Sequence, residues 1–208
     1  MRLRHKPNAI PEMEKNPYVF FGGDKYKGKW KEIFANDNPI HLEIGAGMGD
    51  FIIQKALHNK DINYIALEMN TNAFVVASRK ILDEEIQNVR GLIANAENLE
   101  DFFERGEIDK IYLNFSTPWP KTRHHKRRLS HKRFLDRYVN IVKNGSVLEL
   151  KTDNEEFFDA SLEYFQEYGM TIEKVDRNLS ISESFVTEYE NKFRKKNMPI
   201  YFVRASFE

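Results

Sequence analysis

The sequence predicts an α/β fold, built as a mostly parallel seven-stranded sheet with helices on both faces. Short apolar segments typical of buried strands alternate with amphipathic helical segments along most of the 208 residues. A glycine-rich turn follows the first of these strands, and later connections are short. Because parallel strands need crossover connections, which are usually helical, this alternation favours a sheet covered on both sides.

The first 38 residues are polar and appear irregular in pattern, with three prolines, a Gly22-Gly23 pair and a short helix expected at 30–34. Four basic residues near the start form a small patch: Arg2, Arg4, His5 and Lys6. This patch is either a disordered end or an arm that becomes ordered on a polyanion. No linker follows, so we expect one domain over 1–208 with a polar N-terminal extension at about 1–38.

Strands and helices then alternate in order. The expected strands span residues 40–44, 64–68, 89–94, 108–115, 146–151, 170–175 and 200–207. The expected helices span residues 50–58, 71–83, 134–142, 155–168 and 188–196. The Asn144-Gly145 pair is typical of a helix end and is expected to terminate the third of these helices.

Composition narrows the class of protein. The chain has no cysteine, which excludes disulfides, thiolate metal sites and a cysteine nucleophile. It has no apolar stretch of about 18 residues and no signal peptide, so a cytoplasmic protein is expected. No set of His, Asp and Glu has convincing metal-ligand spacing, and no metal is expected.

Positive charge is concentrated in one segment, although the chain as a whole has 32 basic and 32 acidic residues. Residues 121–137 hold eight Lys or Arg against one acid, Asp136, whereas 83–107 and 153–173 are rich in acids. This basic segment directly follows a Pro118-Trp119-Pro120 turn, which neither a strand nor a helix can continue. A solvated helix face is the alternative, but the pattern favours a surface for nucleic acid beside a small pocket.

The glycine-rich turn has the spacing G-x-G-x-G at Gly45, Gly47 and Gly49. The dinucleotide-binding fingerprint requires its third glycine at position 50, which is Asp. Glu43 and Asp50 would also repel a pyrophosphate. The turn therefore suits a ligand with a cationic part and no phosphates.

Polar side chains also end the next two strands. Glu68 stands where an acid typically binds both hydroxyls of a ribose, and the amide of Asn95 can pair with a base edge. Each has an alternative reading as a strand-end cap. Together with the glycine turn they indicate a nucleoside-containing cofactor, and S-adenosylmethionine fits because it carries a sulfonium and no phosphate.

Several motifs carry a resemblance to a known family: Glu-Ile-Gly-x-Gly-x-Gly from Glu43, strand-end Glu68, NFSTPWPKTRHHKRRL from 114 to 129, Lys-Thr-Asp-Asn at 151–154 and Thr-Glu-Tyr-Glu at 187–190. From about residue 40 to its end the chain resembles the bacterial tRNA (guanine-N7-)-methyltransferases. The resemblance implies the class I methyltransferase fold, which is Rossmann-like. It also implies methyl transfer from S-adenosylmethionine to N7 of guanine 46 in the tRNA variable loop.

The same resemblance assigns residues. The implied cofactor contacts are Glu43, Gly45, Gly47, Glu68, Asn95 and Thr117. The implied contacts to the target guanosine are Lys121, Asp153, Thr187, Glu188, Tyr189 and Glu190. The implied RNA contacts are Arg123, His124, His125, Lys126, Arg127 and Arg128. Thr117 and Asp153 are the expected catalytic residues, while the alternative for 187–190 is a helix start with Thr187 and Glu190 in a capping box.

One position departs from the family pattern, because Thr117 stands where the family has Asp before Pro-Trp. Guanine N7 has a free lone pair, and its methylation releases no N7 proton, so no general base is required. Alignment of the reacting atoms supplies about 7–11 kcal/mol in favourable cases. An active enzyme is therefore expected.

Two other functions remain as alternatives. The first is an inactive homologue that binds S-adenosylmethionine and tRNA, and the second is a nicotinamide-dependent oxidoreductase, which the glycine spacing disfavours. The expected partner is tRNA, without a membrane, and a homodimer remains open.

Overall fold

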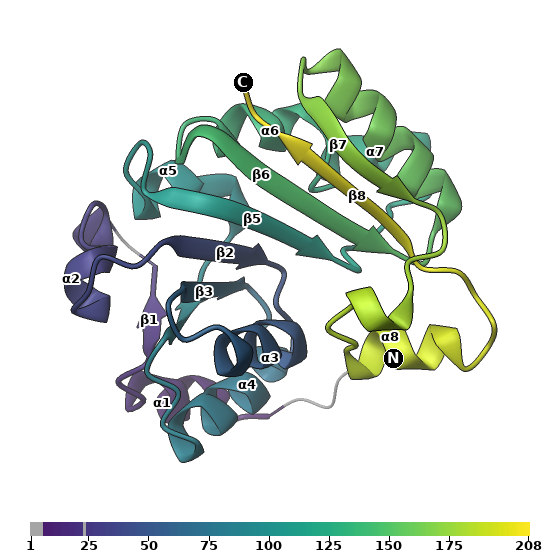
Figure 1. Cartoon of the computed structure of the whole chain (residues 1–208). Coiled ribbons are helices and arrows are strands. Elements are labelled where there is room, and N and C mark those ends of the chain that lie inside the picture. Colours follow the sequence, from purple (N-terminus) through teal and green to yellow (C-terminus); the bar gives the residue numbers. More distant parts are fainter. Residues whose placement is uncertain (1–5, 23) are drawn as a thin grey trace.

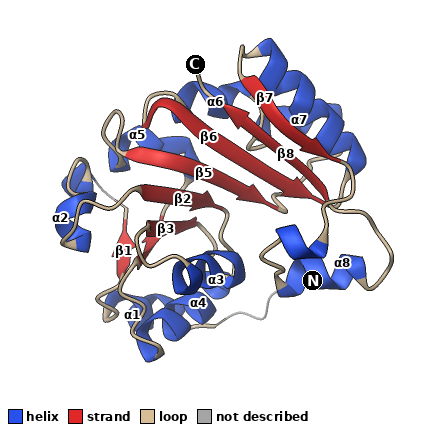
Figure 2. Ribbon diagram, in the orientation of Figure 1, coloured by secondary structure: helices blue, strands red, loops and turns tan. Residues whose placement is uncertain are grey.

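The computed structural model describes residues 6–22 and 24–208, so Arg2, Arg4, His5 and Gly23 lie outside the described residues. The described chain forms a mixed eight-stranded sheet in the order β1-β4-β3-β2-β5-β6-β8-β7 (Figures 1 and 2). Its strands are β1 Val19–Phe21, β2 Ile40–Ile44, β3 Asn63–Glu68, β4 Val89–Ile93, β5 Ile108–Asn114, β6 Val142–Thr152, β7 Thr171–Asp176 and β8 Tyr201–Ser206. Neighbouring strands are parallel from β1 to β6, whereas β8 runs antiparallel to both β6 and β7.

The helices are α1 Ala9–Glu14, α2 Trp30–Phe34, α3 Asp50–His58, α4 Thr71–Asp83, α5 Leu99–Phe102, α6 Lys132–Tyr138, α7 Glu155–Glu167 and α8 Glu188–Arg194. Each of the seven expected strands is present, which confirms the predicted α/β sheet. None of these helices, which cover residues 6–22 and 24–208 only, is long and apolar enough to cross a bilayer.

The N-terminal segment is more ordered than its sequence suggested. Strand β1 pairs in parallel with β4 and adds an eighth strand at the edge of the sheet. Helix α1 buries Ala9 and Met13, and the Trp30 side chain of α2 is fully buried, with its indole N–H donating to the Phe102 carbonyl at 3.0 Å. The short helix expected at 30–34 is confirmed as α2, whereas the expectation of an irregular extension was wrong for α1 and β1. Short apolar segments become stable once the sheet offers a surface to cover.

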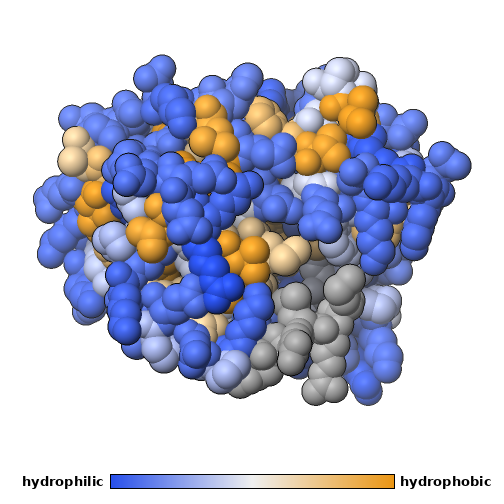
Figure 3. Space-filling model, turned by 90° about the horizontal axis from the view of Figure 1, so that it is seen from below, coloured by the Kyte–Doolittle hydropathy of each residue, from blue (hydrophilic) through white to orange (hydrophobic). Residues whose placement is uncertain are grey.

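Helices cover the two faces of the sheet differently. Helices α5, α6 and α7 pack on one face, with α7 toward the β8–β7 edge, whereas α1, α3 and α4 cover the other face mainly over β3 and β4 (Figure 1). The α3 side of β5, β6 and β8 is therefore seen in Figure 1 without a helix across it. Seen from below, the surface is mostly hydrophilic, with apolar residues in separate small groups (Figure 3).

The helix end expected at Asn144-Gly145 was misplaced. Helix α6 ends at Tyr138, and strand β6 already begins at Val142, whose partner in β5 is Ile108. The register shifts before the next printed pair, Lys110 with Val147, and Gly145 takes a φ of 74° inside this irregular stretch. The glycine thus bends a strand instead of ending a helix, because the neighbouring strand supplies hydrogen bonds that the local sequence does not reveal.

The strand order predicts where a ligand-binding crevice lies, because its direction reverses at β2. The chain runs from β2 outward through β3 to β4, and then returns to the other side of β2 as β5. In such sheets the crevice at the carboxyl ends of the two central strands is the usual ligand site. Here that crevice lies between the loop after β2 and the loop after β5.

Candidate active site

The loop after β2 forms one wall of the crevice. Gly45 and Gly47 have positive φ angles of 81° and 58°, and a Cβ on either would meet nothing within 4 Å. A Cβ on Gly49, by contrast, would lie 2.6 Å from the Cβ of Ala77. The first two glycines thus leave open space for a ligand, and the third lets α3 approach α4.

Glu68, at the end of β3, holds this loop. Its Oε2 accepts the Gly47 N–H at 2.9 Å, and its Oε1 accepts the Asn70 N–H at 2.7 Å. The Oδ1 of Asn95 accepts the Glu97 N–H at 3.0 Å, so Asn95 does cap the turn that follows its strand. Both side chains also line the crevice, so the capping role and the binding role are compatible.

Glu43 ends β2 as a buried carboxyl group, 2% exposed. Its Oε1 accepts from the Asn114 amide at 2.9 Å, while its Oε2 has no partner among the described residues. Burial raises the pKa of Glu43 to about 8, against the smaller lowering effects of Asn114 and Lys151. Burial thus favours the protonated form of Glu43, and the expectation that Glu43 and Asp50 repel a pyrophosphate stays a prediction.

The crevice consists of two pockets that share Gly45 and Phe115. The larger, about 570 Å³, is lined on one side by Glu68 and Asn95 and on the other by Thr117 and Trp119. The smaller, about 250 Å³, is lined by Glu43, Gly45, Gly47, Thr187 and Tyr189, among others. The fold thus brings together all six residues expected to contact a cofactor.

The loop after β5 is held from behind by Arg128. Phe115 and Trp119 have positive φ angles of 49° and 43°, on either side of Thr117. The fully buried Arg128 donates to the Pro118 carbonyl at 2.7 Å and to Glu156 at 2.9 Å. Arg128 was predicted to contact RNA, and this was wrong because its guanidinium is enclosed by the loop that it supports.

The rest of the basic segment divides into paired and unpaired cations. Lys132, Arg133 and Arg137 form ion pairs with Asp136, Glu97 and Glu100, respectively. Four exposed side chains have no ion pair within the described part of the chain: Lys121, Arg123, Lys126 and Arg127. The surface that can receive a polyanion is therefore half the size that a count of charges suggests.

Aromatic contacts join this surface to the crevice. The Arg127 guanidinium lies 5.0 Å from the Trp119 ring centroid, and the half-buried His124 meets the same ring edge-on at 5.7 Å. The Nε2 of His125, also half-buried, lies 3.9 Å from Glu156. Trp119 and Arg127 both line the larger pocket, so the exposed cations begin at its rim.

Helix α8 closes the smaller pocket. The Oγ1 of Thr187 accepts the Glu190 N–H at 3.0 Å, which confirms Thr187 as the N-cap. The capping box itself is not formed within the described residues, because the Glu190 carboxylate bonds other partners. Glu190 was expected to contact the guanosine, but its side chain is fully buried and bonds Lys151 at 2.9 Å and Arg194 at 2.8 Å. Its charge is already neutralised by these two cations, so it anchors α8.

The other expected guanosine contacts lie around this helix. Tyr189 is half exposed and lines the pocket, whereas Glu188 and Lys121 are exposed and line neither pocket. Asp153 is partly buried, which raises its pKa. Burial and then the negative charge of Asp153 raise the pKa of Tyr189, but Asp153 itself lines neither pocket.

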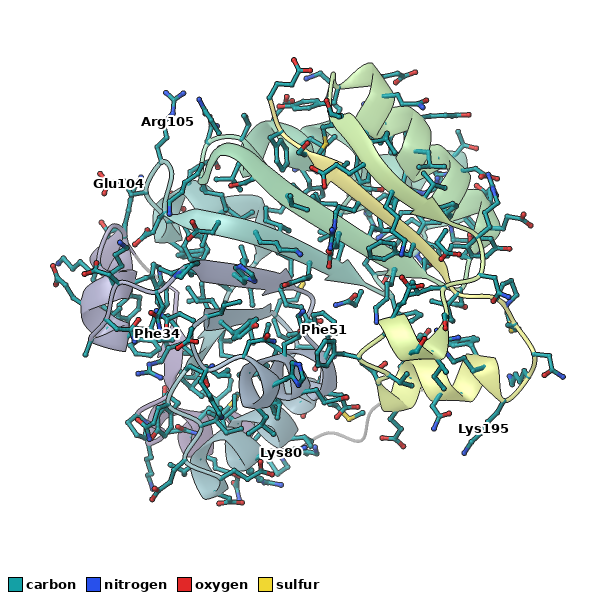
Figure 4. The ribbon with its side chains drawn as sticks, viewed as in Figure 1. Phe34, Phe51, Lys80, Glu104, Arg105 and Lys195 are labelled. Carbon is teal, nitrogen blue, oxygen red and sulfur yellow. The ribbon has the colours of Figure 1, made fainter. Side chains whose placement is uncertain are left out.

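Three site residues were not found from the sequence. Asn114 holds Glu43, Phe115 separates the two pockets, and Phe51 projects from α3 toward the loop before α8 (Figure 4). The sequence could have indicated Asn114 and Phe115, because they directly precede the Ser-Thr-Pro-Trp turn at the end of a predicted strand. Within residues 6–22 and 24–208, no three His, Asp or Glu side chains cluster as a set of metal ligands.

Comparisons with known proteins agree with this arrangement. A family model described as "Putative methyltransferase" matches residues 37–203. Proteins named tRNA (guanine-N(7)-)-methyltransferase from Streptococcus uberis and Bacillus licheniformis are each 44% identical over 211 residues, which cover 100% of this chain and 100% and 99% of theirs.

Solved structures share the fold at low sequence identity. An antibiotic-related methyltransferase superposes with a TM-score of 0.70 at 19% identity, over 92% of this chain and 97% of the other. The 16S rRNA methyltransferase KamB gives a TM-score of 0.67 at 13% identity, over 86% and 93%. These two likenesses confirm the predicted methyltransferase fold.

Proposed function

Since the chain belongs to the tRNA (guanine-N7-)-methyltransferase family, we propose that it is a single methyltransferase domain that methylates N7 of a guanine in tRNA. The observation that carries the proposal is the crevice, where Thr117 and Trp119 face Glu68 and Asn95. The proposed target is guanine 46 of the variable loop, and the proposed place of action is the cytoplasm.

The crevice residues fit S-adenosylmethionine, which supplies the methyl group when bound. Gly45 and Gly47 leave room at the backbone, and Glu43 presents an unpartnered Oε2 to the smaller pocket. We assign Glu68 to the ribose hydroxyls and Asn95 to the adenine edge, since both line the larger pocket beside the glycine loop. Each Glu68 oxygen keeps a second lone pair after its backbone bond.

Methyl transfer here requires alignment more than proton transfer. The N7 lone pair of guanine forms the new bond to the methyl carbon as the carbon–sulfur bond breaks, and no proton leaves N7. Thr117 adds a hydroxyl at the rim of the larger pocket, and Asp153 follows β6 two residues after Lys151, near enough for its charge to raise the pKa of Tyr189 at the smaller pocket. We assign Asp153 to the guanine N1–H and amino group, which hold the base in line.

Exposed cations on the same side support a polyanionic substrate. Lys121, Arg123, Lys126 and Arg127 follow the Pro-Trp turn that lines the crevice. Lysine and arginine neutralise backbone phosphates and carry little sequence information, so this surface positions the tRNA. The inactive alternative finds no support, because full-length relatives at 44% identity are named as methyltransferases.

The test is incubation of the protein with methyl-labelled S-adenosylmethionine and an unmodified tRNA transcript, followed by nucleoside analysis. We expect label in 7-methylguanosine. A transcript with 7-deazaguanosine at position 46 is the matched control, because it lacks only the N7 acceptor, and it should take up no label. Label in another nucleoside, or no label in either transcript, would contradict the proposal.

A further inference from the structure

A second cavity, of about 310 Å³, lies on the α3 side of the sheet, next to the crevice. Its lining includes residues of β5, β6 and β8, on the face that no helix covers in Figure 1. Phe51 and Asn114 line both this cavity and the smaller pocket of the crevice. Phe51, labelled in Figure 4, therefore stands between the two spaces.

This cavity holds more positive than negative charge. Lys110 and Arg204 share one carboxylate, since both bond Oε1 of Glu149, at 2.7 and 2.6 Å. Lys55 has no ion pair within residues 6–22 and 24–208, and its ammonium lies 4.6 Å from the Phe185 ring centroid. Three cations therefore face one carboxylate.

Other charged groups at the cavity do not remove this excess. Lys151 is matched by Glu190 at 2.9 Å, and Lys174 is matched by Glu183 at 2.6 Å. Lys110 and Glu149 are largely buried, with side chains 17% and 13% exposed. The Arg204 side chain is 42% exposed, so the cavity is open to solvent on that side. An excess of positive charge beside the largely buried Lys110 is unfavourable and favours the arrival of a counter-charge.

Burial and the positive charge at the cavity lower the pKa of two groups, Lys55 itself and the neighbouring His41. Burial lowers the pKa of Lys55, and Lys110, Lys151 and Arg204 lower it further against the opposing effect of Glu149. Burial likewise lowers the pKa of His41 to about 4, with further lowering by Lys110 and Lys55. The half-buried His41 ring hydrogen-bonds the Tyr112 hydroxyl at 2.9 Å, so His41 stays neutral and adds no charge.

We propose that this cavity is an anion site that binds a phosphate group through Lys55, Lys110 and Arg204. Ammonium and guanidinium groups are the donors that proteins typically offer to phosphate. The Nε and Nη2 of Arg204 both bond Glu149, so Nη1 is the nitrogen through which Arg204 would reach the anion. The phosphate belongs either to the tRNA backbone or to free inorganic phosphate. Only the assignment of the phosphate to tRNA rests on the proposed function; the anion site itself rests on the charges that line the cavity.

Lys55→Gln is the cleanest test, because it removes one cation and breaks no ion pair. Lys60→Gln is its matched control, since Lys60 is exposed just beyond the same helix. Calorimetric titration with inorganic phosphate at low ionic strength should show binding to the native protein. Lys55→Gln should weaken it about tenfold, the effect of one charge-assisted hydrogen bond, and Lys60→Gln should leave it unchanged.

Binding of unmodified tRNA against salt concentration separates the two sources. If the phosphate is part of tRNA, Lys55→Gln lowers the log–log salt slope by up to about one unit. If it is free phosphate, tRNA binding stays native while phosphate binding falls. Native behaviour of Lys55→Gln toward both probes would overturn the site, and a folded Arg204→Gln that binds phosphate like the native protein would do the same.

These outcomes are independent of the proposed function. Absence of 7-methylguanosine with intact phosphate binding would refute the methyltransferase and leave the anion site standing. If 7-methylguanosine forms but Lys55→Gln binds phosphate and tRNA like the native protein, the methyltransferase stands and the anion site is refuted.

Discussion

Over β2, β5 and β6 the two faces of the central sheet differ in character, one apolar and one polar, whereas over β3 and β4 both faces carry an apolar core. On the side of α5 to α7, alternate residues of β2, β5 and β6 are apolar and buried, as with Leu42, Leu113 and Leu148. The residues between them point to the α3 side, where Glu43, Glu149 and Lys151 stand. A strand exposes successive side chains to opposite faces, so one run of residues supplies both a core and a site.

The contrast separates residues that stabilise the fold from residues that could bind a ligand. The apolar face gains stability from burial alone, without a need for partners. On the polar face, most buried charged groups are paired with an opposite charge. At Glu43 and Lys55 the pairing among the described residues is incomplete, and these are the groups that we propose to contact ligands. The following substitutions test the division, starting with the largest expected effect.

Lys151→Met should destabilise the protein most, by about 3–5 kcal/mol, because it leaves the buried Glu190 carboxylate with Arg194 as its only cation. Urea unfolding measures the change. Lys174→Met is the control, since its pair with Glu183 is exposed and should contribute no more than about 1 kcal/mol. Equal effects of the two variants would show that the α8 anchor is not a buried pair in solution.

On the apolar face, Leu148→Ala should cost about 2–5 kcal/mol, because it opens a cavity beneath a fully buried side chain. The folded variant should still bind S-adenosylmethionine with native affinity, since its side chain lies on the opposite face from Glu43. Urea unfolding and calorimetry below the transition give the two quantities. A large loss of cofactor affinity would break the separation of the faces.

Glu68→Ala should weaken cofactor binding by about 1.5–3 kcal/mol, since it removes a charged acceptor and releases the Gly47 amide. Binding of tRNA should change less, because Glu68 forms no ion pair with the exposed cations within the described residues and only shares the larger pocket with Arg127. Calorimetry with S-adenosylmethionine and a filter-binding assay with tRNA compare the two. Unchanged cofactor affinity would show that Glu68 only braces the loop.

Per pH unit, the smallest effect comes from the titration of Glu43. The pKa of Glu43 is raised to about 8 in the folded protein, so the native state holds a proton that the unfolded state, with the ordinary pKa of 4.5, has lost. Stability should therefore fall as pH rises from 4.5 to 8, by at most about 1.4 kcal/mol per pH unit. His41, with its pKa lowered to about 4, opposes this trend below pH 6.5.

The window from pH 6.5 to 8 consequently isolates Glu43 from His41. Free energies of unfolding measured across it should decline for the native protein and stay flatter for Glu43→Gln, which keeps the shape and removes the titration. Parallel curves for the two proteins would mean that Glu43 is ionised in the folded state.

Much of the site followed from local pattern, because strand ends and glycine spacing are local properties. The alternation of strands and helices predicted the parallel sheet, and parallel strands bring their carboxyl ends to one edge. Glu68, Asn95 and Thr117 therefore meet in one crevice although 49 residues separate the first from the last. The motif NFSTPWPKTRHHKRRL also identified the loop that forms the opposite wall.

The predictions that failed concerned charged side chains whose ion-pair partners lie far away in the sequence. Arg127 and Arg128 are adjacent and identical in the sequence, yet one lies over Trp119 at the surface and the other is enclosed beneath the loop. Glu190 was read as a ligand and is instead bonded to Lys151, 39 positions earlier. Burial and pairing are sums over the whole fold, so the residue type alone does not fix them.

The sequence by itself thus determined the order of elements, the edge of the sheet where chemistry occurs and the family to which the chain belongs. Tertiary structure alone decided which charges are free, because a carboxylate or guanidinium is available only if no opposite charge packs against it. It also raised the pKa of Glu43, through burial, and set Lys55 beside Lys110 and Arg204 with the single carboxylate of Glu149 among them. These are properties of position in three dimensions, which no spacing along the chain encodes.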